Sequence, residues 1–333
     1  MKPILEIKNL SVDFKVNDKA LRAVDDLSMT IYRGDIVGII GESGSGKSTL
    51  ASGILKTVRA PGKVSQGEII YHTPDGEKVD LLKLSSKEYA KYRWTNITTV
   101  FQAAQNVLNP SLKIKEHFLE TAWAHDNSLS DAEIMEKAKE LMKSVRLEER
   151  VLESYPHQLS GGMKQRTIIA LSLLLEPDLL ILDEPTTALD VITQWYIIDI
   201  LRKIHDKTNI TMIFLTHDVS IIGSVVNRLA VMYAGQLVEY GDVESLFFDP
   251  THPYTYGLMH AIPSLRDDMS KRRAIPGYPP NMLNLPHMCR FTPRCPIAQA
   301  GKCEGIKEKT DVMYNSKDSQ FTRCYSWEKV KEL

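Results

Sequence analysis

Eight consecutive residues carry the clearest chemical pattern in the chain. Gly41-Glu42-Ser43-Gly44-Ser45-Gly46-Lys47-Ser48 follows the pattern G-x-x-x-x-G-K-[ST]. Glycines let such a loop turn its backbone N–H groups inward, and a helix that starts there adds the positive end of its dipole, so the loop can hold phosphate. Lys47 is predicted to reach the β and γ phosphates, the Ser48 hydroxyl to bind Mg²⁺, and Thr49 to contact the α phosphate. The loop therefore predicts a site for a nucleoside triphosphate.

The flanking residues supply the elements that such a loop requires. The apolar run from Asp35 to Ile40 predicts a strand before the loop, and a helix is predicted after it because apolar residues recur at helical spacing. A Gly/Ser-rich turn could match the pattern by chance, but strand, loop and helix in this order favour the phosphate site. The helical positions are Leu50, Ala51, Ile54, Leu55 and Val58.

Polar side chains follow three predicted core strands. Leu179 to Leu182 is apolar and ends in Asp183 and Glu184, Thr211 to Thr216 is followed by His217, and Ile97 to Phe101 by Gln102. Ligands of α/β sheets bind at the carboxyl ends of strands. Asp183 is predicted to hold Mg²⁺ through water, Glu184 to polarise the attacking water, and His217 to contact the γ phosphate. Alone, Gln102 would be a solvated loop residue and His217 a surface or core histidine.

A second glycine-containing helix start follows later in the chain. Ser160-Gly161-Gly162 precedes the apolar helical pattern from Ile168 to Leu175, so its N–H groups could also cradle phosphate. An ordinary helix cap is the alternative. Between Leu112 and Val145 the pattern is also helical, and Ser130-x-x-Glu133 predicts a capping box before a packed face of Ile134, Ala138, Leu141, Met142 and Val145.

The N-terminal quarter predicts strands of an antiparallel sheet. Ile4 to Phe14 and Leu27 to Ile31 alternate apolar and polar residues. Phe14, upstream of the phosphate loop, could stack on adenine or pack in the core. Ala60 to Leu84 predicts a surface hairpin excursion that turns at Thr73-Pro74-Asp75-Gly76, and Leu229 to Val238 a hairpin that turns at Ala234-Gly235.

Composition narrows the class of protein. The chain has 333 residues and a formal net charge of −1, which argues against nucleic acid as the partner. Met1 to Glu6 lacks the features of a signal peptide. The most apolar stretch, Ile168 to Leu182, is interrupted by Glu176, Pro177 and Asp178, whereas a bilayer span needs about 20 apolar residues. The sequence predicts a soluble or peripheral protein.

Taken in order, these motifs resemble the nucleotide-binding subunit of ATP-binding cassette (ABC) transporters. The resemblance implies an α/β fold: a RecA-like P-loop NTPase core, an antiparallel β subdomain and an α-helical subdomain that carries the signature Leu159 to Gln165. It makes Phe14 the aromatic that stacks on adenine, Gln102 a catalytic residue and Mg²⁺ ligand, and Asp190 part of a nucleotide-binding D-loop with Ala188 and Leu189. It also implies that two subunits meet head to tail, so that Ser160, Gly161 and Gly162 complete the partner's ATP site.

The C-terminal part narrows the resemblance further. Thr251-His252-Pro253-Tyr254-Thr255, Ala261-Ile262-Pro263, Ile275-Pro276-Gly277-x-Pro279-Pro280 and Cys289-Arg290-Phe291-x-Pro293-Arg294-Cys295-Pro296 resemble the extension of dipeptide and oligopeptide importer ATPases. Met163 in the signature is similar to the D-type subunit of that group, which commonly pairs with an F-type ATPase. Ala103-Ala104 departs from the usual Glu-Pro after the glutamine and puts contacts with the membrane subunit in doubt, whereas Leu108-Asn109-Pro110 matches.

This resemblance implies a domain division and a set of partners. We expect a nucleotide-binding domain over 1–250, with a helical subdomain at about 103–165, and an extension over 251–333. The expected partners are a second ATPase subunit, either F-type or a second copy, two transmembrane permease subunits and, through them, an extracytoplasmic substrate-binding protein. The expected location is the cytoplasmic face of the cell membrane.

All four cysteines, Cys289, Cys295, Cys303 and Cys324, lie near the C-terminus. Their spacing is wider than in most structural zinc sites, which disfavours a zinc ribbon, and four thiolates can hold a [4Fe–4S] cluster. From the residues alone, a metal or cluster and plain reduced cysteines remain equal alternatives, and disulfides are less expected. The resemblance to peptide-importer ATPases, whose extension binds such a cluster, favours the cluster.

The predicted function is thus Mg·ATP binding and hydrolysis that drives import of dipeptides or oligopeptides. Related ATPases serve nickel and oligosaccharide importers, so those cargoes are alternatives. A soluble ABC ATPase of nucleic-acid repair or of the ribosome is a further alternative, but the chain shows neither a long heptad insert between the motifs nor a second motif set.

Overall fold

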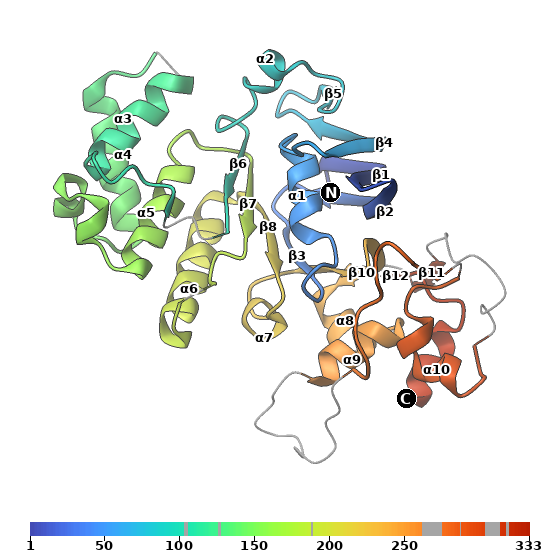
Figure 1. Ribbon diagram of the computed structural model, residues 1–333. Helices are drawn as coiled ribbons and strands as arrows, with labels where there is room; N and C mark the ends of the chain where they lie inside the picture. The colour runs from blue at the N-terminus through green and yellow to red at the C-terminus, as the bar shows by residue number, and fades with distance from the viewer. Residues whose placement is uncertain are drawn as a thin grey trace. The chain divides into compact units, whose positions relative to one another are not determined.

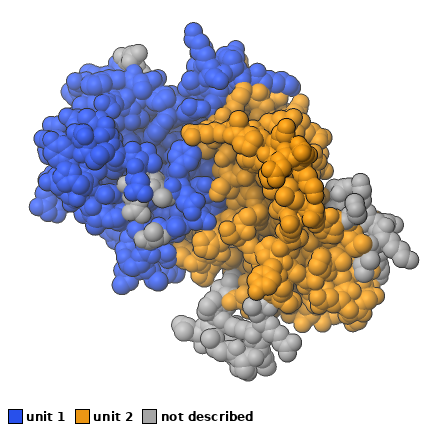
Figure 2. All heavy atoms as spheres, in the orientation of Figure 1, with its two compact units in different colours: residues 1–2, 32–35, 83–215 blue, residues 3–31, 36–82, 216–333 orange. Residues whose placement is uncertain are grey.

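The computed structural model describes residues 1–102, 106–125, 128–187, 189–261, 275–286, 288–303, 314–317 and 320–333. The chain forms two compact units, drawn in blue and orange in Figure 2. Unit 1 comprises residues 1–2, 32–35 and 83–215, and unit 2 comprises residues 3–31, 36–82 and 216–333. Ala103, Ala104, Ala188, Ile262 and Pro263, which the sequence analysis named, lie outside the described residues.

Unit 1 contains three parallel strands and most of the longer helices (Figure 1). The strands are paired in the order β8-β7-β6, with Thr98 opposite Leu180 and Leu182 opposite Phe214. All five residues of β7 are buried, as expected of a continuous apolar strand in a parallel sheet. The elements are α2 (Ser86–Tyr89), β6 (Ile97–Val100), α3 (Ile114–His125), α4 (Asp131–Ser144), η2 (Glu149–Glu153), η3 (Pro156–Gln158), α5 (Gly161–Ser172), β7 (Leu179–Asp183), α6 (Val191–Thr208) and β8 (Thr211–Thr216).

The predicted capping box opens α4. The Ser130 side chain accepts from the Glu133 N–H group while the Glu133 carboxylate accepts from the Ser130 N–H group, so two otherwise unpaired donors are satisfied. Ile134, Ala138 and Met142 of the predicted face are buried. Leu141 is only half-buried, because it lines a cavity described below.

Unit 2 contains two groups of paired strands. An antiparallel sheet has the order β2-β1-β4-β5, and a second group has the order β11-β12-β10-β9-β3, in which only β3 and β9 are parallel. The elements are β1 (Pro3–Val16), β2 (Lys19–Tyr32), β3 (Ile36–Ile40), α1 (Lys47–Ile54), β4 (Gly62–His72), β5 (Lys78–Asp80), α7 (Val219–Ile222), β9 (Arg228–Tyr233), β10 (Gln236–Asp242), α8 (Val243–Phe248), α9 (Pro253–Ala261), η5 (Thr292–Arg294), α10 (Pro296–Gln299), β11 (Tyr314–Lys317), β12 (Gln320–Thr322) and η7 (Trp327–Glu332).

The sequence-based expectations for unit 2 hold in part. Both predicted hairpins are present, and the turn between β9 and β10 uses Ala234 at φ 46° and Gly235 at φ 85°. The expected surface excursion from Ala60 was wrong, because β4 pairs with β1 from Leu5 to Phe14 and is an inner strand of the sheet. The helix after the phosphate loop is shorter than the apolar spacing predicts, since it ends at Ile54 and Lys56 turns at φ 53°.

A large buried cluster joins β9 to the C-terminal extension within unit 2. The rings of Tyr233, Tyr254 and Phe291 lie 4.6 to 5.4 Å apart between centroids. Aromatic rings at such spacings contribute attraction beyond the area that they bury. Within the described ranges, no helix has both the length and the apolar composition that crossing a membrane would require.

Candidate functional site

The phosphate loop joins β3 to α1 in unit 2 (Figure 1). Gly41 has φ 153°, and a Cβ atom there would lie 2.1 Å from the Met232 carbonyl oxygen. Gly46, the residue that caps α1, has φ 105°, and its Cβ would lie 2.4 Å from the Ala23 carbonyl oxygen. Only glycine fits at both positions. The predicted order of strand, loop and helix is confirmed.

Lys47 is held at the loop by oxygen atoms of the loop itself. Its side-chain Nζ donates to the carbonyl oxygens of Gly41 at 2.7 Å and Glu42 at 3.1 Å, and to Ser45 Oγ at 3.4 Å. The residue is only 7% exposed. Ser43, Gly44 and Ser48 are exposed. The Lys47 ammonium therefore lies against the loop, and the binding of phosphate and Mg²⁺ by these residues stays a prediction.

The structure brings Gln102 and Glu184 together in unit 1. The Gln102 Nε2 atom donates to Glu184 Oε2 at 3.1 Å. Thr187 Oγ1 donates to the same oxygen at 2.8 Å, and the Glu184 N–H group donates to the Leu215 carbonyl oxygen at 2.8 Å. Glu184 itself has φ 48°, which these contacts stabilise. Thr187 was not among the predicted site residues, although its place three residues after Glu184 was a usable signal.

Asp183 and His217 lie where the strand pattern predicts them along the chain. Asp183 is the buried last residue of β7 and pairs with Leu215 of β8. His217 directly follows β8 and has an exposed side chain. Asp218 caps the short helix α7 by accepting from the Ser220 N–H group at 3.1 Å. Each predicted polar residue therefore stands at or just beyond the carboxyl end of its strand.

The signature residues start α5. The Ser160 Oγ atom caps this helix by accepting from the Met163 N–H group at 3.3 Å. A Cβ atom on Gly162 would lie 2.9 Å from Cγ2 of Thr193, so α5 approaches the first turn of α6 closely. Asp190 caps α6 by accepting from Thr193 N–H at 3.0 Å and from its hydroxyl at 2.6 Å, and these bonds lower the Asp190 pKa. The signature and Asp190 are thus connected within unit 1 through Thr193.

Two arginines fix α5 to its neighbours. The Arg166 guanidinium donates to the carbonyl oxygen of Arg146 at 2.8 Å, just after the end of α4. Arg146 in turn donates to Asp199 of α6 at 2.6 Å, and both guanidinium groups lie over the Tyr196 ring at 4.7 and 5.3 Å. These contacts link α4, α5 and α6. The exposed Ser160 hydroxyl is therefore carried on a fixed helix.

Phe14 is a half-buried residue of β1. A Cβ atom on Gly62, its partner in β4, would lie 2.5 Å from Cε1 of the ring. The ring therefore packs against the backbone of Gly62. Its stacking on adenine stays a prediction.

The four cysteines lie in the extension and form no disulfide. Burial raises the pKa of Cys289 and Cys324, and raises that of Cys295 to about 11. The thiolate charges of the other three cysteines act in the same direction on the pKa of Cys324. Among the described residues, no three His, Cys, Asp or Glu side chains stand close enough to share one metal ion.

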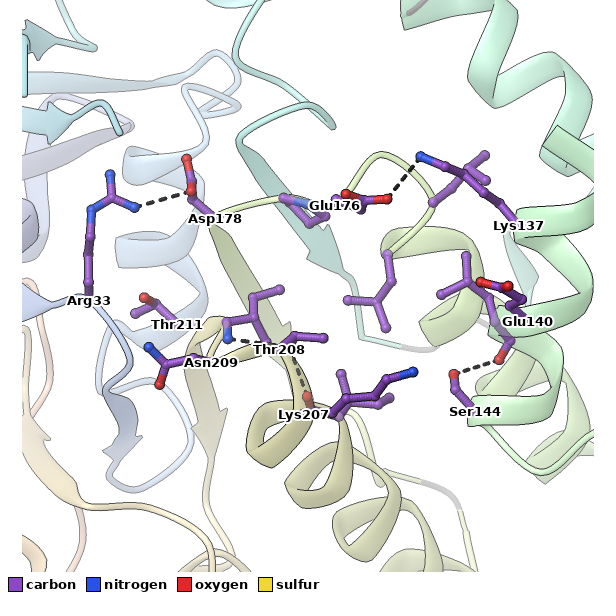
Figure 3. A pocket seen from close by; sticks show the side chains of 16 residues that line it. Arg33, Lys137, Glu140, Ser144, Glu176, Asp178, Lys207, Thr208, Asn209 and Thr211 are labelled. Atoms are coloured by element: carbon purple, nitrogen blue, oxygen red, sulfur yellow. Dashed lines mark hydrogen bonds and ion pairs between the residues drawn. The ribbon is translucent and has the colours of Figure 1, made fainter. Parts of the chain in front are cut away.

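A cavity of about 480 Å³ lies at the amino ends of β7 and β8 in unit 1 (Figure 3). Its rim carries the ion pairs Arg33 to Asp178 at 3.1 Å and Lys137 to Glu176 at 2.9 Å. None of the predicted site residues lines it. Because Asp183 and Glu184 follow the other end of β7, this cavity is separate from the predicted ATP chemistry.

The glycine loop after β3 and the carboxylates at the end of β7 define a P-loop ATPase. Comparison of the sequence with known protein families identifies two matching regions. Residues 24–187 match the ABC transporter family, and residues 238–303 match the oligopeptide/dipeptide transporter C-terminal region. The ATP-binding cassette MJ0796, solved as a dimer in a post-hydrolysis state with ADP and Pi, is 29% identical with a TM-score of 0.63 and covers 72% of this chain and 99% of its own.

Curated relatives extend the match to nearly the whole chain. The dipeptide transport ATP-binding protein DppD of Caldanaerobacter subterraneus subsp. tengcongensis is 45% identical over 90% of both chains. The oligopeptide transport ATP-binding protein OppD of Haemophilus influenzae is 41% identical over 90% of this chain and 91% of its own, and that of Escherichia coli is 39% identical over 89% and 86%. This chain belongs to the ABC transporter ATPases, in the family of oligopeptide/dipeptide transporter ATP-binding proteins. The resemblance and the fold class that the sequence predicts are confirmed.

Proposed function

We propose that this chain hydrolyses ATP to power the import of dipeptides or oligopeptides. The observation that carries the proposal is the match of residues 238–303 to the oligopeptide/dipeptide transporter C-terminal region. Relatives that are 39 to 45% identical over about nine tenths of the chain carry dipeptide or oligopeptide transport in their names. Cassette motifs alone support ATP hydrolysis, and this region adds the cargo class.

The residue roles in hydrolysis follow from chemistry and motif position. Lys47 and the loop N–H groups bind phosphate, and Ser48, Gln102 and Asp183 supply the oxygen ligands that Mg²⁺ prefers. Bound Mg²⁺ supplies neutralisation of phosphate charge. Glu184 accepts a proton from the attacking water, and His217 contacts the γ phosphate. The bonds from Gln102 and Thr187 to Oε2 of Glu184 orient the carboxylate.

A second ATPase subunit, either F-type or another copy, completes each site. The start of α6, beside the signature, exposes Val191 at 67% and Ile192 at 83% of their surface. Apolar side chains so exposed next to Ser160 and Asp190 support a face that a partner covers. In this arrangement Ser160, Gly161, Gly162 and Asp190 contact nucleotide held by the partner's phosphate loop.

The membrane partners are two permease subunits, which in turn meet an extracytoplasmic binding protein. Phe101 and Val107, on either side of the segment 103–105, are exposed apolar residues in unit 1. They support a contact between this part of unit 1 and a permease. The chain would then sit on the cytoplasmic face of the membrane as a peripheral subunit, with a nucleotide-binding domain over 1–250 and an extension over 251–333.

The four cysteines are proposed to hold a [4Fe–4S] cluster. All four cysteines of the chain lie within the extension, between residues 289 and 324, which supports a shared site. No group of three side chains fits a single ion among the described residues, and a four-iron cluster is larger than one ion, so its ligands stand further apart. Protein purified without oxygen should contain about four iron atoms and as many labile sulfides per chain. Colourless, iron-free protein would contradict the cluster without touching the ATPase proposal.

The transport proposal is tested by reconstitution with the permease subunits and binding protein of the same operon. Binding protein loaded with a dipeptide or an oligopeptide should stimulate ATP hydrolysis and uptake of the labelled peptide. The Glu184→Gln subunit is the matched control and should support neither. Stimulation only by nickel or by an oligosaccharide would replace the cargo class, and failure of the chain to copurify with the permeases would contradict the transport role.

A further inference from the structure

The phosphate loop is bound by the C-terminal extension through one ion pair. Arg294, directly before Cys295, donates from Nη1 to Glu42 Oε2 at 2.9 Å and from Nη2 to Glu42 Oε1 at 3.0 Å. Two parallel bonds of this kind fix both position and orientation. The residues are 252 positions apart in sequence, and both lie in unit 2.

Arg294 is itself immobilised. Its Nε donates to the Pro276 carbonyl oxygen at 2.8 Å and its Nη1 also to Tyr233 Oη at 3.4 Å. The guanidinium lies 5.7 Å from the Tyr233 ring centroid and 5.9 Å from that of Phe291. The side chain is only 5% exposed. Because Nε and Nη1 are also held by groups other than Glu42, the guanidinium sets the position of the Glu42 carboxylate.

Glu42 is engaged through each of its polar groups. Its N–H group donates to Tyr254 Oη at 3.0 Å, and its carbonyl oxygen accepts from Lys47 Nζ at 3.1 Å and from the Ser45 N–H group at 3.1 Å. The Glu42 carboxylate accepts the two hydrogen bonds from Arg294. The extension thus sets the position of the residue whose carbonyl group helps to hold the phosphate-binding lysine.

A second arginine of the same segment reaches the loop by another route. Arg290 donates to the Ala234 carbonyl oxygen and to Asp25. The neighbouring Gly235 N–H group donates to the Ser45 carbonyl oxygen of the loop at 2.9 Å. The segment between Cys289 and Cys295 therefore supports the loop at Glu42 and at Ser45.

We propose that Arg294 is a positioning residue that, through Glu42, holds the phosphate loop in its nucleotide-binding shape. Without it the loop spends only part of its time in that shape, and the apparent dissociation constant rises by the inverse of that fraction. The effect falls on ATP and ADP alike, because the loop is preorganised before either binds. The inference rests on the proposed nucleotide site and not on the proposed cluster.

The test measures Mg·ADP binding to the full-length chain by calorimetry, together with the melting temperature. We expect Arg294→Met and Glu42→Gln each to raise the dissociation constant about tenfold or more, and the double variant to bind no worse than the weaker single variant. Arg294→Lys, which keeps the charge but not the fork, should restore only part of the affinity. Arg228→Met is the matched control: it removes the ion pair to Asp242 at 3.6 Å, at the opposite end of β9 from the loop, and should leave the dissociation constant unchanged.

The possible results distinguish a failure of this inference from a failure of the proposed nucleotide site. Folded Arg294→Met protein whose dissociation constant lies within twofold of the parent would overturn it, as would losses of affinity that add in the double variant. Should Arg294→Met fail to fold, the milder Glu42→Gln variant decides alone. A parent chain that does not bind Mg·ADP would contradict the nucleotide site itself.

Discussion

Glu184 accepts a hydrogen bond of 3.1 Å from Gln102, a residue 82 positions earlier in the chain. Both follow parallel strands of unit 1, β6 and β7, whose pairing places their carboxyl ends side by side. The bond occupies Oε2, which also accepts from Thr187, so two donors orient the carboxylate.

Replacing Glu184 with Gln should abolish turnover and preserve binding. An amide cannot accept the proton of the attacking water, and loss of a general base typically costs about 10² to 10⁴-fold in rate. Single-turnover hydrolysis and equilibrium binding of Mg·ATP measure the two effects. The exposed Glu136→Gln serves as control, and undiminished single-turnover hydrolysis would remove Glu184 as the base.

Thr187 should help to orient the Glu184 carboxylate. Thr187→Val removes the 2.8 Å bond to Oε2, so the carboxylate should be held less firmly and the rate of hydrolysis should fall severalfold. Single-turnover hydrolysis of Mg·ATP measures this loss. Thr187→Ser keeps the hydroxyl and should restore the rate. An unchanged rate for the valine variant would show that this bond has no role in hydrolysis.

Lys47→Ala should weaken nucleotide binding. The ammonium is predicted to make charge-assisted bonds to phosphate, each contributing about 1.5–3 kcal/mol, so affinity for Mg·ATP should fall at least tenfold. Calorimetry measures the loss, with the exposed Lys87→Ala as control. Unchanged affinity would mean that the loop does not bind phosphate as proposed.

Ser160 can be tested for its two roles separately. Ser160→Ala removes the helix cap and should lower stability by about 1 kcal/mol as well as slow hydrolysis. Ser160→Asp keeps a capping oxygen, so the melting temperature should stay near that of the parent, but its charge would repel the partner-bound phosphate and stop turnover. Normal hydrolysis by the aspartate variant would contradict a nucleotide contact at Ser160.

His252 should make the extension sensitive to acid. Complete burial, with the nearby charge of Arg323, lowers its pKa from 6.5 to about 3. Below pH 6.5 the unfolded chain therefore binds a proton that the folded chain rejects. His252 therefore does not lower the free energy of unfolding above about pH 6.5. Between about pH 6.5 and about pH 3 it lowers that free energy by up to about 1.4 kcal/mol for each pH unit of acidification.

The variant His252→Asn tests this prediction, because asparagine can keep the hydrogen bond of His252 but cannot bind a proton in this pH range. The ring Nδ1 accepts from the Tyr254 N–H group at 3.1 Å, and the side-chain oxygen of His252→Asn can do the same. Melting temperatures between pH 7 and pH 4.5 should fall less steeply for this variant than for the parent. The exposed His260→Asn should keep the parental slope, and equal slopes for all three proteins would contradict the assignment.

Local patterns in the sequence were sufficient for the elements of the site. The strand before the loop, the Ser130 capping box and the apolar run into Asp183 all appear as predicted, because each depends on neighbours within a few residues. The length of α1 was not predictable in this way. Val58 fits the helical spacing, yet the chain turns at Lys56. The periodicity of apolar residues does not report the backbone conformation at that position.

Contacts between residues far apart in the chain could not be predicted from the sequence either. Periodicity predicted the strands of the N-terminal sheet but not that β4 pairs with β1 along most of its length, since pairing depends on which edges meet in the folded chain. The motif around Arg294 was visible, but its contact with Glu42 was not, because an ion pair over 252 residues has no local signal.

The sequence by itself determined the family, the phosphate loop and the order of the strands that carry the polar residues, since these follow from residue type and spacing. Only the tertiary structure decided which of those residues touch. It joined Gln102 and Thr187 to one oxygen of Glu184, and it placed Arg294 of the extension on Glu42. Such contacts depend on how distant segments pack, and packing is settled by the whole chain at once.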